Sequence, residues 1–234
     1  MLLEDLVAQR FRNFEVIIVD GRSTDKTARI VSTFHTKDSR FTLKRCVERN
    51  VSTQRNLGAK HAKGQMLLFL DADARITSMF LIDLKNVLKQ YPCDAWTVFA
   101  RPDTSTMADT IFMSIQNYLF TLLSSIKKPF CWGACLGCSR IAFHTSNGFN
   151  HKINFMEDSE FVQALVKKNF TFRVFSKPVF TFSMRRYKKS GKLELIRRVL
   201  PHHLKAFFLE EYTIPKSAYP MRGGASYSQR RTKI

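Results

Sequence analysis

Apolar and polar positions alternate along the first half of the chain in two different periods. Short apolar runs that end at polar turns predict buried strands, and the segments between them have helical spacing and end signals. The predicted strands are 15–19, 41–47, 66–70 and 95–100, and the predicted helices run from Ser23 or Thr24 to about Phe34, from 53 to Gly64 and from Ser78 to Lys89. This alternation predicts an α/β fold with a mostly parallel central sheet flanked by helices.

The second half of the chain has a different pattern. An apolar stretch, 106–126, predicts a core or interfacial helix; its part 111–126 is uncharged but interrupted by Gln116, Asn117 and serine residues. Phe161, Leu165 and Val166 mark one face of another helix. Two short strands, 171–175 and 179–184, precede an amphipathic basic helix that Pro201 breaks or kinks. We therefore divide the chain into a domain of residues 1–192, a helical extension of 193–212 and a poorly ordered basic tail of 213–234.

The chain is strongly basic, and much of the excess charge lies near its end. It carries 38 Lys and Arg against 19 Asp and Glu, and residues 185–234 hold thirteen of the basic residues against three acidic ones. This bias suits an anionic partner such as a phospholipid surface, a phosphorylated substrate or nucleic acid. The alternative is a solubilising surface with a loose tail. Nucleic acid is the least expected of these partners, because no feature other than the charge favours it.

The sequence also bears on location. No stretch has the roughly 18 uncharged apolar residues that a membrane span requires. The first residues are acidic where a signal peptide would be basic, and the five cysteines are an odd number. We expect reduced thiols and a cytosolic protein, either free or attached peripherally to the inner face of the membrane through the basic amphipathic helix.

Three aspartates directly follow predicted strands: Asp20 after EVIIV, and Asp71 and Asp73 after MLLFL. Ligands of parallel sheets bind beyond the carboxyl ends of the strands. Two carboxylates one residue apart can share a magnesium ion and leave its other positions to phosphate oxygens. The alternative is that Asp71 and Asp73 only cap the next helix and shape a turn, because a D-x-D pattern alone is weak.

Four segments that include these residues occur in one order along the chain: VIIVDGRSTDKT, RNLGAKHAKGQMLLFLDADARI, GFNHKINFMEDSEF and SMRRYKKSG. Over about residues 10–192 the series resembles the inverting glycosyltransferases with a nucleotide-diphospho-sugar transferase (GT-A type) fold, which include dolichol-phosphate mannose synthases and chitin and hyaluronan synthases. The resemblance implies a nucleotide-diphospho-sugar donor, Mg²⁺ or Mn²⁺ as cofactor, and an acceptor hydroxyl or lipid phosphate, with a lipid-linked acceptor as one option.

The resemblance also implies a role for each residue that it carries over. The nucleotide sugar would be bound by Asp20, Ser23, Asp25, Arg55, Asn56, Asp71 and Asp73, and the metal by Asp73 and Asp71. The acceptor or its phosphate would be bound by Trp132, Gly133, Arg185 and Arg186. Asp158 would be the catalytic base that takes the proton of the attacking acceptor hydroxyl. The alternative for Asp158 is an ordinary acid in the first turn of a helix, like Glu157 and Glu160.

Two features depart from the family pattern or compete with it. The family's first strand, which helps to bind the nucleotide, has no counterpart here, because residues 1–14 look like the end of the first helix. This departure favours a rival hypothesis, a non-catalytic relative that binds anions on a membrane or nucleic acid, and we expect the chain as given to be compromised in activity. Cys131, Cys135 and Cys138 have a C-x3-C-x2-C spacing that can hold an iron–sulfur cluster, whereas the resemblance places them in an acceptor-side loop.

Overall fold

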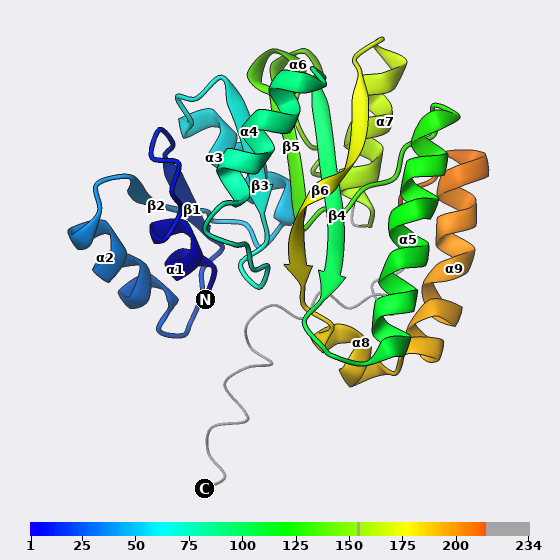
Figure 1. Ribbon diagram of the computed structural model, residues 1–234, viewed down its shortest axis with the longest axis horizontal. Helices are drawn as coiled ribbons and strands as arrows, with labels where there is room; N and C mark the ends of the chain where they lie inside the picture. Colours follow the sequence, from blue (N-terminus) through cyan, green and yellow to red (C-terminus); the bar gives the residue numbers. More distant parts are fainter. Residues whose placement is uncertain (154, 214–234) are drawn as a thin grey trace, which may run out of the picture.

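The computed structural model describes residues 1–153 and 155–213, without the side chains of Ser190, Lys192, Leu193 and Leu195 (Figure 1). The strands are β1 Val16–Asp20, β2 Phe41–Arg45, β3 Met66–Leu70, β4 Ala95–Pro102, β5 Cys135–Ser139 and β6 Phe172–Phe182. The helices are α1 Leu2–Val7, α2 Thr27–Lys37, α3 Val51–His61, α4 Phe80–Gln90, α5 Met107–Ser125, α6 Arg140–Thr145, α7 Glu157–Lys167, α8 Arg185–Ser190 and α9 Lys192–Leu209. The tail predicted at 213–234 lies outside the described residues from position 214 on.

The strands form two sheets with helices around them, which confirms the predicted α/β class (Figure 1). β1 and β2 make a parallel two-stranded sheet, and the other strands make a four-stranded sheet in the order β3-β5-β4-β6. β4 and β6 are parallel, whereas β5 runs antiparallel to both of its neighbours. The carboxyl ends of β1 and β3 carry the acids that the sequence singles out.

The structure corrects the prediction in the segment around β5 and β6. Residues 135–139, expected in an acceptor-side loop, form the strand between β3 and β4, and the two short strands expected near 171–184 are one strand. The register of β6 against β4 shifts between Val98 and Ala100, which explains why its apolar pattern reads as two pieces. The sequence CLGCS gives little strand signal because it has no β-branched or aromatic residue.

One apolar core cluster includes residues of both sheets. It includes Phe41 of β2, Phe80 of α4, and Trp96 and Val98 of β4. The opposite face of the four-stranded sheet packs against a second cluster around Phe161 and its neighbours from α6 and α7. Each of these large side chains contributes on the order of 2 kcal/mol through its removal from water.

The strands at the facing edges of the two sheets are less buried than the sequence predicts. Val16–Val19, read as a buried strand, is half-buried, and Met66 at the start of β3 is exposed. Val16 and Asp20 form backbone hydrogen bonds on the β2 side of β1. Because these bonds alternate along a parallel pair, the backbone N–H and C=O groups of Ile17 and Val19 point to the other edge of β1. Within the described residues β1 and β3 are not paired, and this open edge is the reason for the partial exposure.

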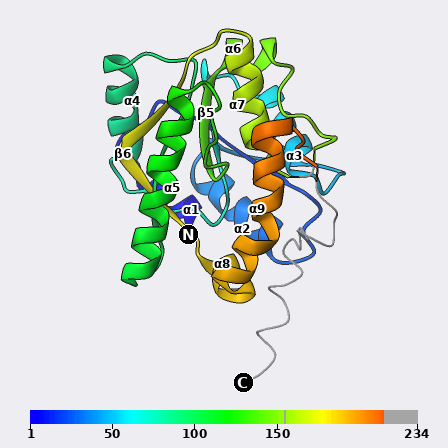
Figure 2. The same ribbon diagram turned by 90° about the vertical axis from the view of Figure 1, so that its right-hand side faces the viewer.

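The C-terminal part of the described chain is helical. The basic segment SMRRYKKSG includes α8, and the amphipathic extension expected at 193–212 is α9, which continues through Pro201. Phe130, Ala206 and Tyr212 belong to a small cluster that holds α9 against the end of α5. Figure 2 shows α5 and α9 on the same side of the molecule. Between residues 1 and 213, position 154 apart, none of the helices combines the length and apolar character needed to cross a bilayer.

Gly137 offers a test of the packing of the central strand. A Cβ atom at this position would lie 2.2 Å from ring atoms of Trp96, and Trp96 is too buried to move aside. We expect Gly137→Ala to lower the free energy of unfolding by about 2 kcal/mol, because overpacking strains a filled core. Gly64→Ala is the matched control, since its Cβ would meet nothing closer than 3.4 Å. Urea unfolding of both variants measures the difference, and equal stabilities would contradict the packing described for β5.

Candidate active site

The D-x-D pair lies at the end of β3. The backbone N–H of Asp71 donates to the carbonyl of Ala134 (3.1 Å), and the carbonyl of Asp71 accepts from the N–H of Ala74 (2.9 Å). These bonds close a turn that leaves both carboxylates partly accessible, with the side chains of Asp71 and Asp73 each 45% exposed. The pair is therefore positioned by a strand end and remains within reach of a ligand.

Arg55 of α3 joins the acid pair to the helix that carries Asp158. Its Nη2 donates to Asp71 Oδ1 (3.2 Å) and to the carbonyl of Gly133 (2.9 Å), and its Nη1 donates to Glu157 Oε1 (2.9 Å). The guanidinium also lies over the ring of Phe149, 5.2 Å from its centroid. One side chain thus connects α3, the end of β3, the turn before β5 and the start of α7.

The charge of Arg55 is buried but surrounded by acids. Burial opposes the charged form, yet Asp71, Glu157 and Asp158 outweigh it and raise the pKa of Arg55. The guanidinium is therefore a fixed positive charge at the centre of the site. Because Asp71 and Glu157 occupy it, we describe Arg55 as a positioning residue in this structure.

Asp158 lies in the first turn of α7, next to the backbone of Gly133. A Cβ atom at Gly133 would be 2.0 Å from Asp158 Oδ2, so only glycine leaves room for this carboxyl. Burial, reinforced by the charge of Glu157, raises the pKa of Asp158 to about 7, although Arg55 acts in the opposite direction. A carboxyl group with such a pKa is suited to accept a proton near neutral pH.

Asp73 faces the basic helix α8. Arg185 Nη2 donates to Asp73 Oδ2 at 3.2 Å, which links SMRRYKKSG to the D-x-D pair. Burial and the nearby charge of Asp71 raise the pKa of Asp73, while Arg185 and Arg186 oppose this rise. Arg185 therefore lies where the resemblance implies phosphate contacts, beside the acid pair.

The residues expected on the nucleotide side lie at the end of β1. Asp20 is buried, and its Oδ1 accepts the N–H of Ser23 at 3.1 Å, so these two residues form one turn. Asp25 accepts both the hydroxyl and the N–H of Thr27, and these bonds lower its pKa. The predicted start of this helix at Ser23 or Thr24 is thus wrong: α2 begins at Thr27, after Asp25.

Asn56 has a structural contact. Its side chain accepts the N–H of Phe149 and donates to the carbonyl of the same residue, both at 2.8 Å. These bonds fix the turn at Gly148, whose φ of +70° favours glycine. Asn56 therefore orders the loop that leads to α7.

Trp132, expected on the acceptor side, is buried next to Gly133. Its Nε1 donates to Asn117 Oδ1 of α5 (2.9 Å), and Asn117 also bonds to both backbone groups of Ala100. Rings of Phe120 and Phe182 enclose the indole at centroid distances of 5.0 and 5.2 Å. Trp132 thus holds the turn that contains Gly133 in place.

Two residues of the site were not predicted from the sequence. Glu157 was read as a first-turn acid, but it is buried and paired with Arg55. Asn117 was read as an interruption of an apolar helix, but it holds Trp132. The only signal for Asn117 is an amide within a largely apolar helix, where a buried polar side chain needs partners.

The donor set fits a hard divalent cation in part. Asp71 and Asp73 supply two carboxylates, and magnesium is commonly held by one or two carboxylates together with phosphate oxygens. In the described part of the chain, no three or more His, Cys, Asp or Glu side chains form a group suited to a metal. The remaining ligands of a cation here would thus come from the substrate or from water.

The three cysteines of the C-x3-C-x2-C pattern are distributed over two faces of the sheet. Cys135 packs in the main core, whereas Cys131 and Cys138 pack in the cluster beneath α7. Burial raises the pKa of all three thiols, that of Cys138 to about 12. These side chains serve as small apolar core residues in this structure.

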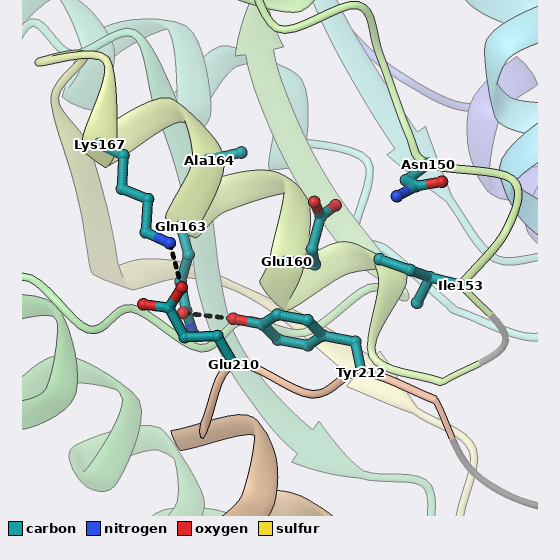
Figure 3. A pocket seen from close by; sticks show the side chains of 8 residues that line it. All are labelled: Asn150, Ile153, Glu160, Gln163, Ala164, Lys167, Glu210 and Tyr212. Atoms are coloured by element: carbon teal, nitrogen blue, oxygen red, sulfur yellow. Dashed lines mark hydrogen bonds and ion pairs between the residues drawn. The ribbon is translucent and has the colours of Figure 1, made fainter. Parts of the chain in front are cut away.

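A small hollow of about 280 Å³ lies along α7, apart from the acids of the site (Figure 3). It is closed by the ion pair of Lys167 and Glu210 and by the hydroxyl of Tyr212, which donates to Gln163 Oε1 at 2.5 Å. None of Asp71, Asp73 and Asp158 lines it. The candidate active site is the open edge at the end of β3, and this hollow is not part of it.

Comparison with known proteins agrees with the fold. The chain matches the family described as Glycosyl transferase family 2 over residues 2–146, which is more than half of its length. The chain therefore belongs to this family, as the sequence resemblance indicates. The segments that carry Asp158 and Arg185 lie beyond the matched residues.

Two curated relatives match part of the chain. A UDP-Glc:alpha-D-GlcNAc-diphosphoundecaprenol beta-1,3-glucosyltransferase, WfaP of Escherichia coli, is 37% identical over 75 residues, which are 30% of this chain and 28% of that protein. The glycosyltransferase GlyA of Streptococcus pneumoniae is 26% identical over 92 residues, 39% of this chain and 13% of that protein. The match covers well under two thirds of either relative.

Solved structures support the GT-A type fold. A mannosyltransferase from Pyrobaculum calidifontis in complex with GDP-Man and Mn²⁺ gives a TM-score of 0.68 at 19% identity, over 91% of this chain and 60% of that one. S. aureus TarS 1-349 in complex with UDP-GlcNAc gives a TM-score of 0.63 at 22% identity, over 78% of this chain and 53% of that one. At these identities the likeness establishes the fold.

Removal of Arg55 tests the contacts at the centre of the site. Arg55→Ala would leave Glu157 buried without its partner, so we expect a loss of about 3 kcal/mol in the free energy of unfolding. Arg198→Ala is the control, because it removes an exposed helical pair with Glu194 that contributes well under about 1 kcal/mol. Denaturant unfolding of both variants gives the two values. A loss for Arg55→Ala no larger than that of the control would mean that the buried network does not stabilise the fold.

The pKa of Asp158 predicts a pH dependence of stability. Since it is raised from 3.8 to about 7, the folded chain keeps a proton that the unfolded chain releases between these values, and stability falls as the pH rises through this range. Asp158→Asn should flatten the slope of stability against pH and should be more stable than the parent chain above that range. Asp83→Asn, at an exposed acid of α4, should leave the slope unchanged. Thermal unfolding at several pH values checks this, and parallel curves for parent and Asp158→Asn would contradict it.

Proposed function

We propose that this chain transfers a sugar from a nucleotide-diphospho-sugar to an acceptor hydroxyl or lipid phosphate, with inversion at the anomeric carbon and with the help of Mg²⁺ or Mn²⁺. The observation that carries the proposal is the connection of Asp158 to Asp71 through Arg55 and Gly133. A carboxyl group with a raised pKa and a partly accessible acid pair thus lie on the same edge of the sheet. Family membership and the nucleotide sugars bound by the structural neighbours support the same reading.

The residues divide the reaction between them. Asp158, when deprotonated, accepts the proton of the acceptor hydroxyl as this oxygen attacks the anomeric carbon from the face opposite the leaving group. Asp71 and Asp73 would hold the divalent cation, which neutralises charge on the departing diphosphate. Arg185 and Arg186, next to Asp73, would contact the diphosphate or a phosphate of the acceptor. Asp20, Ser23 and Asp25 would contact or shape the nucleotide side.

The acceptor class that we propose first is a lipid-linked one. Gly133 borders Asp158, Trp132 precedes it in the same turn, and the basic helices α8 and α9 follow the last strand. The name of WfaP describes a diphosphoundecaprenol-linked acceptor, which supports this class. On this proposal the protein works in the cytosol, at the inner face of the membrane.

One observation favours a second function, a non-catalytic relative that binds anions. β1 and β3 are not paired, so the edge that would support the nucleotide is open in the described chain. On this alternative the basic surface binds phosphates or lipid and Asp158 performs no chemistry. The two proposals differ in whether single carboxylates matter to turnover.

Substitution of the acids tests the proposed reaction. Asp158→Asn and Asp73→Ala should each lower kcat/KM by roughly 10²-fold or more, because a general base and a charge-stabilising group each contribute such factors. The rate of the parent chain should rise with pH through about 7, where Asp158 loses its proton. Sugar transfer from UDP- and GDP-sugars in the presence of Mn²⁺ is the measurement, with Asp83→Asn as control.

The same preparations separate the two functions. If Asp158→Asn and Asp73→Ala fold and transfer sugar as fast as the parent chain, the proposed mechanism is wrong. If the folded parent chain transfers no sugar while retaining phosphate or vesicle binding, the non-catalytic alternative is favoured.

A further inference from the structure

The helix α5 carries a continuous exposed apolar face. Its members recur at spacings of three and four residues, which places them on one side of the helix. Ile115 and Leu122 at its centre are each 61% exposed. The face consists of Met107, Ile111, Ile115, Tyr118, Leu119, Leu122 and Ile126. Large apolar side chains gathered in this way on a surface usually mark an interaction site.

The opposite side of α5 is already used by the fold. Asp109, Met113 and Asn117 are buried, and α5 packs against β4 and β6 through this side. Asp109, the only charged residue of the helix, is on this buried side. The core therefore accounts for one face of α5 but not for the other.

The helix α9 extends the exposed apolar surface. Leu200, Leu204 and Phe208 follow one another at intervals of four residues, and Phe208 is 71% exposed. Contacts between Phe130 and Phe207, and the bond from Lys128 Nζ to the carbonyl of Phe207, join the end of α5 to α9. In Figure 2 the two helices lie on the same side of the molecule. We call these residues of α5 and α9 the α5–α9 surface.

Basic side chains border this surface. Residues 185–209, which make up α8 and α9, contain eight Lys and Arg but a single acid, Glu194. On α9, Arg197 and Arg198 are exposed alongside Leu200 and Leu204. Lys127 adds an exposed positive charge at the end of α5. The combination of an apolar centre and a cationic border complements a membrane surface, where acyl chains lie beneath anionic headgroups.

We propose that the α5–α9 surface binds an anionic lipid bilayer, with the apolar side chains inserted among the headgroups and the lysines and arginines on the phosphates. The sequence points to α9 alone, whereas the structure adds α5 and makes it the larger part of the contact. Binding of the bilayer does not depend on the proposed function, but the role that we give to this binding does. Asn117, on the buried side of α5, holds Trp132 on the acceptor side of the site, so docking would bring a lipid-linked acceptor close to Asp158.

Vesicle binding by designed variants tests the proposal. The double substitution Ile115→Asn/Leu122→Asn should reduce sedimentation with phosphatidylcholine–phosphatidylglycerol vesicles by roughly tenfold or more, because apolar insertion is lost while the charges remain. Ile141→Asn is the matched control, since Ile141 is 73% exposed but lies on α6. It should bind as the parent chain does. Vesicles of phosphatidylcholine alone should bind the parent chain far more weakly, and added salt should weaken the anionic binding.

Other outcomes identify other occupants of the surface or overturn the inference. Unchanged binding by the double variant, with an unchanged thermal unfolding midpoint, would show that α5 does not contact lipid. If light scattering shows an oligomer that the double variant loses, and the parent chain does not bind vesicles, the partner is a second copy. If the full chain does not bind vesicles but a variant without residues 214–234 does, the removed segment blocks the surface. The full chain would then not bind the bilayer unless this segment is displaced.

Failure of this inference can be told apart from failure of the proposed function. Vesicle sedimentation needs no nucleotide sugar, and sugar transfer to a water-soluble acceptor needs no vesicle. The double variant should retain transfer to a soluble acceptor, whereas Asp158→Asn should retain vesicle binding. A loss of both properties in the double variant, with normal unfolding, would mean that α5 acts on the site through Trp132 and not on lipid.

Discussion

The site depends on one buried positive charge. A guanidinium removed from water is costly unless acceptors surround it, and Arg55 has found Asp71, Glu157 and the carbonyl of Gly133. These acceptors come from segments far apart in the sequence, so the charge can be satisfied only when those segments meet. Burial of Arg55 is therefore favourable only when Asp71, Glu157 and Gly133 surround its guanidinium. This condition holds the acid pair and the start of α7 at one edge of the sheet.

The same charge sets the protonation of the acids around it. Glu157 lies directly beside Asp158, and two neighbouring carboxylates resist being ionised together, so the charge of Glu157 adds to burial in raising the pKa of Asp158, while Arg55 lowers it. Glu157 forms the ion pair with Arg55, whereas Asp158 lies against Gly133 and accepts the backbone N–H of Ser159 in the first turn of α7. An ion pair that stabilises one acid thus prepares its neighbour to exchange a proton near neutral pH.

The sequence predicts the strand-end acids but not the partners that hold them. Asp71 and Asp73 could be located because an apolar run before a polar turn places its last residue at a sheet edge. The strand β5 was missed because CLGCS lacks the residues typical of strands. The bonds of the Asn56 amide to the backbone of Phe149 were not predicted, because only the fold brings these residues together. The exposed face of α5 was equally hidden, since an apolar helix gives no sign of which side faces solvent.

The helix α3 connects the two halves of the site in a way that neither sheet does. Gly58 allows it to lie against β1, with a Cβ position only 3.3 Å from Val19, while Ala59 packs in the cluster that includes Leu67 of β3. Arg55 on the same helix binds the acid pair. Because β1 and β3 are not hydrogen-bonded to each other, the position of Asp20 relative to Asp71 depends on helix packing and on the shared core rather than on a continuous ladder. Small shifts of α3 would therefore change the distance between Asp20 and the acid pair.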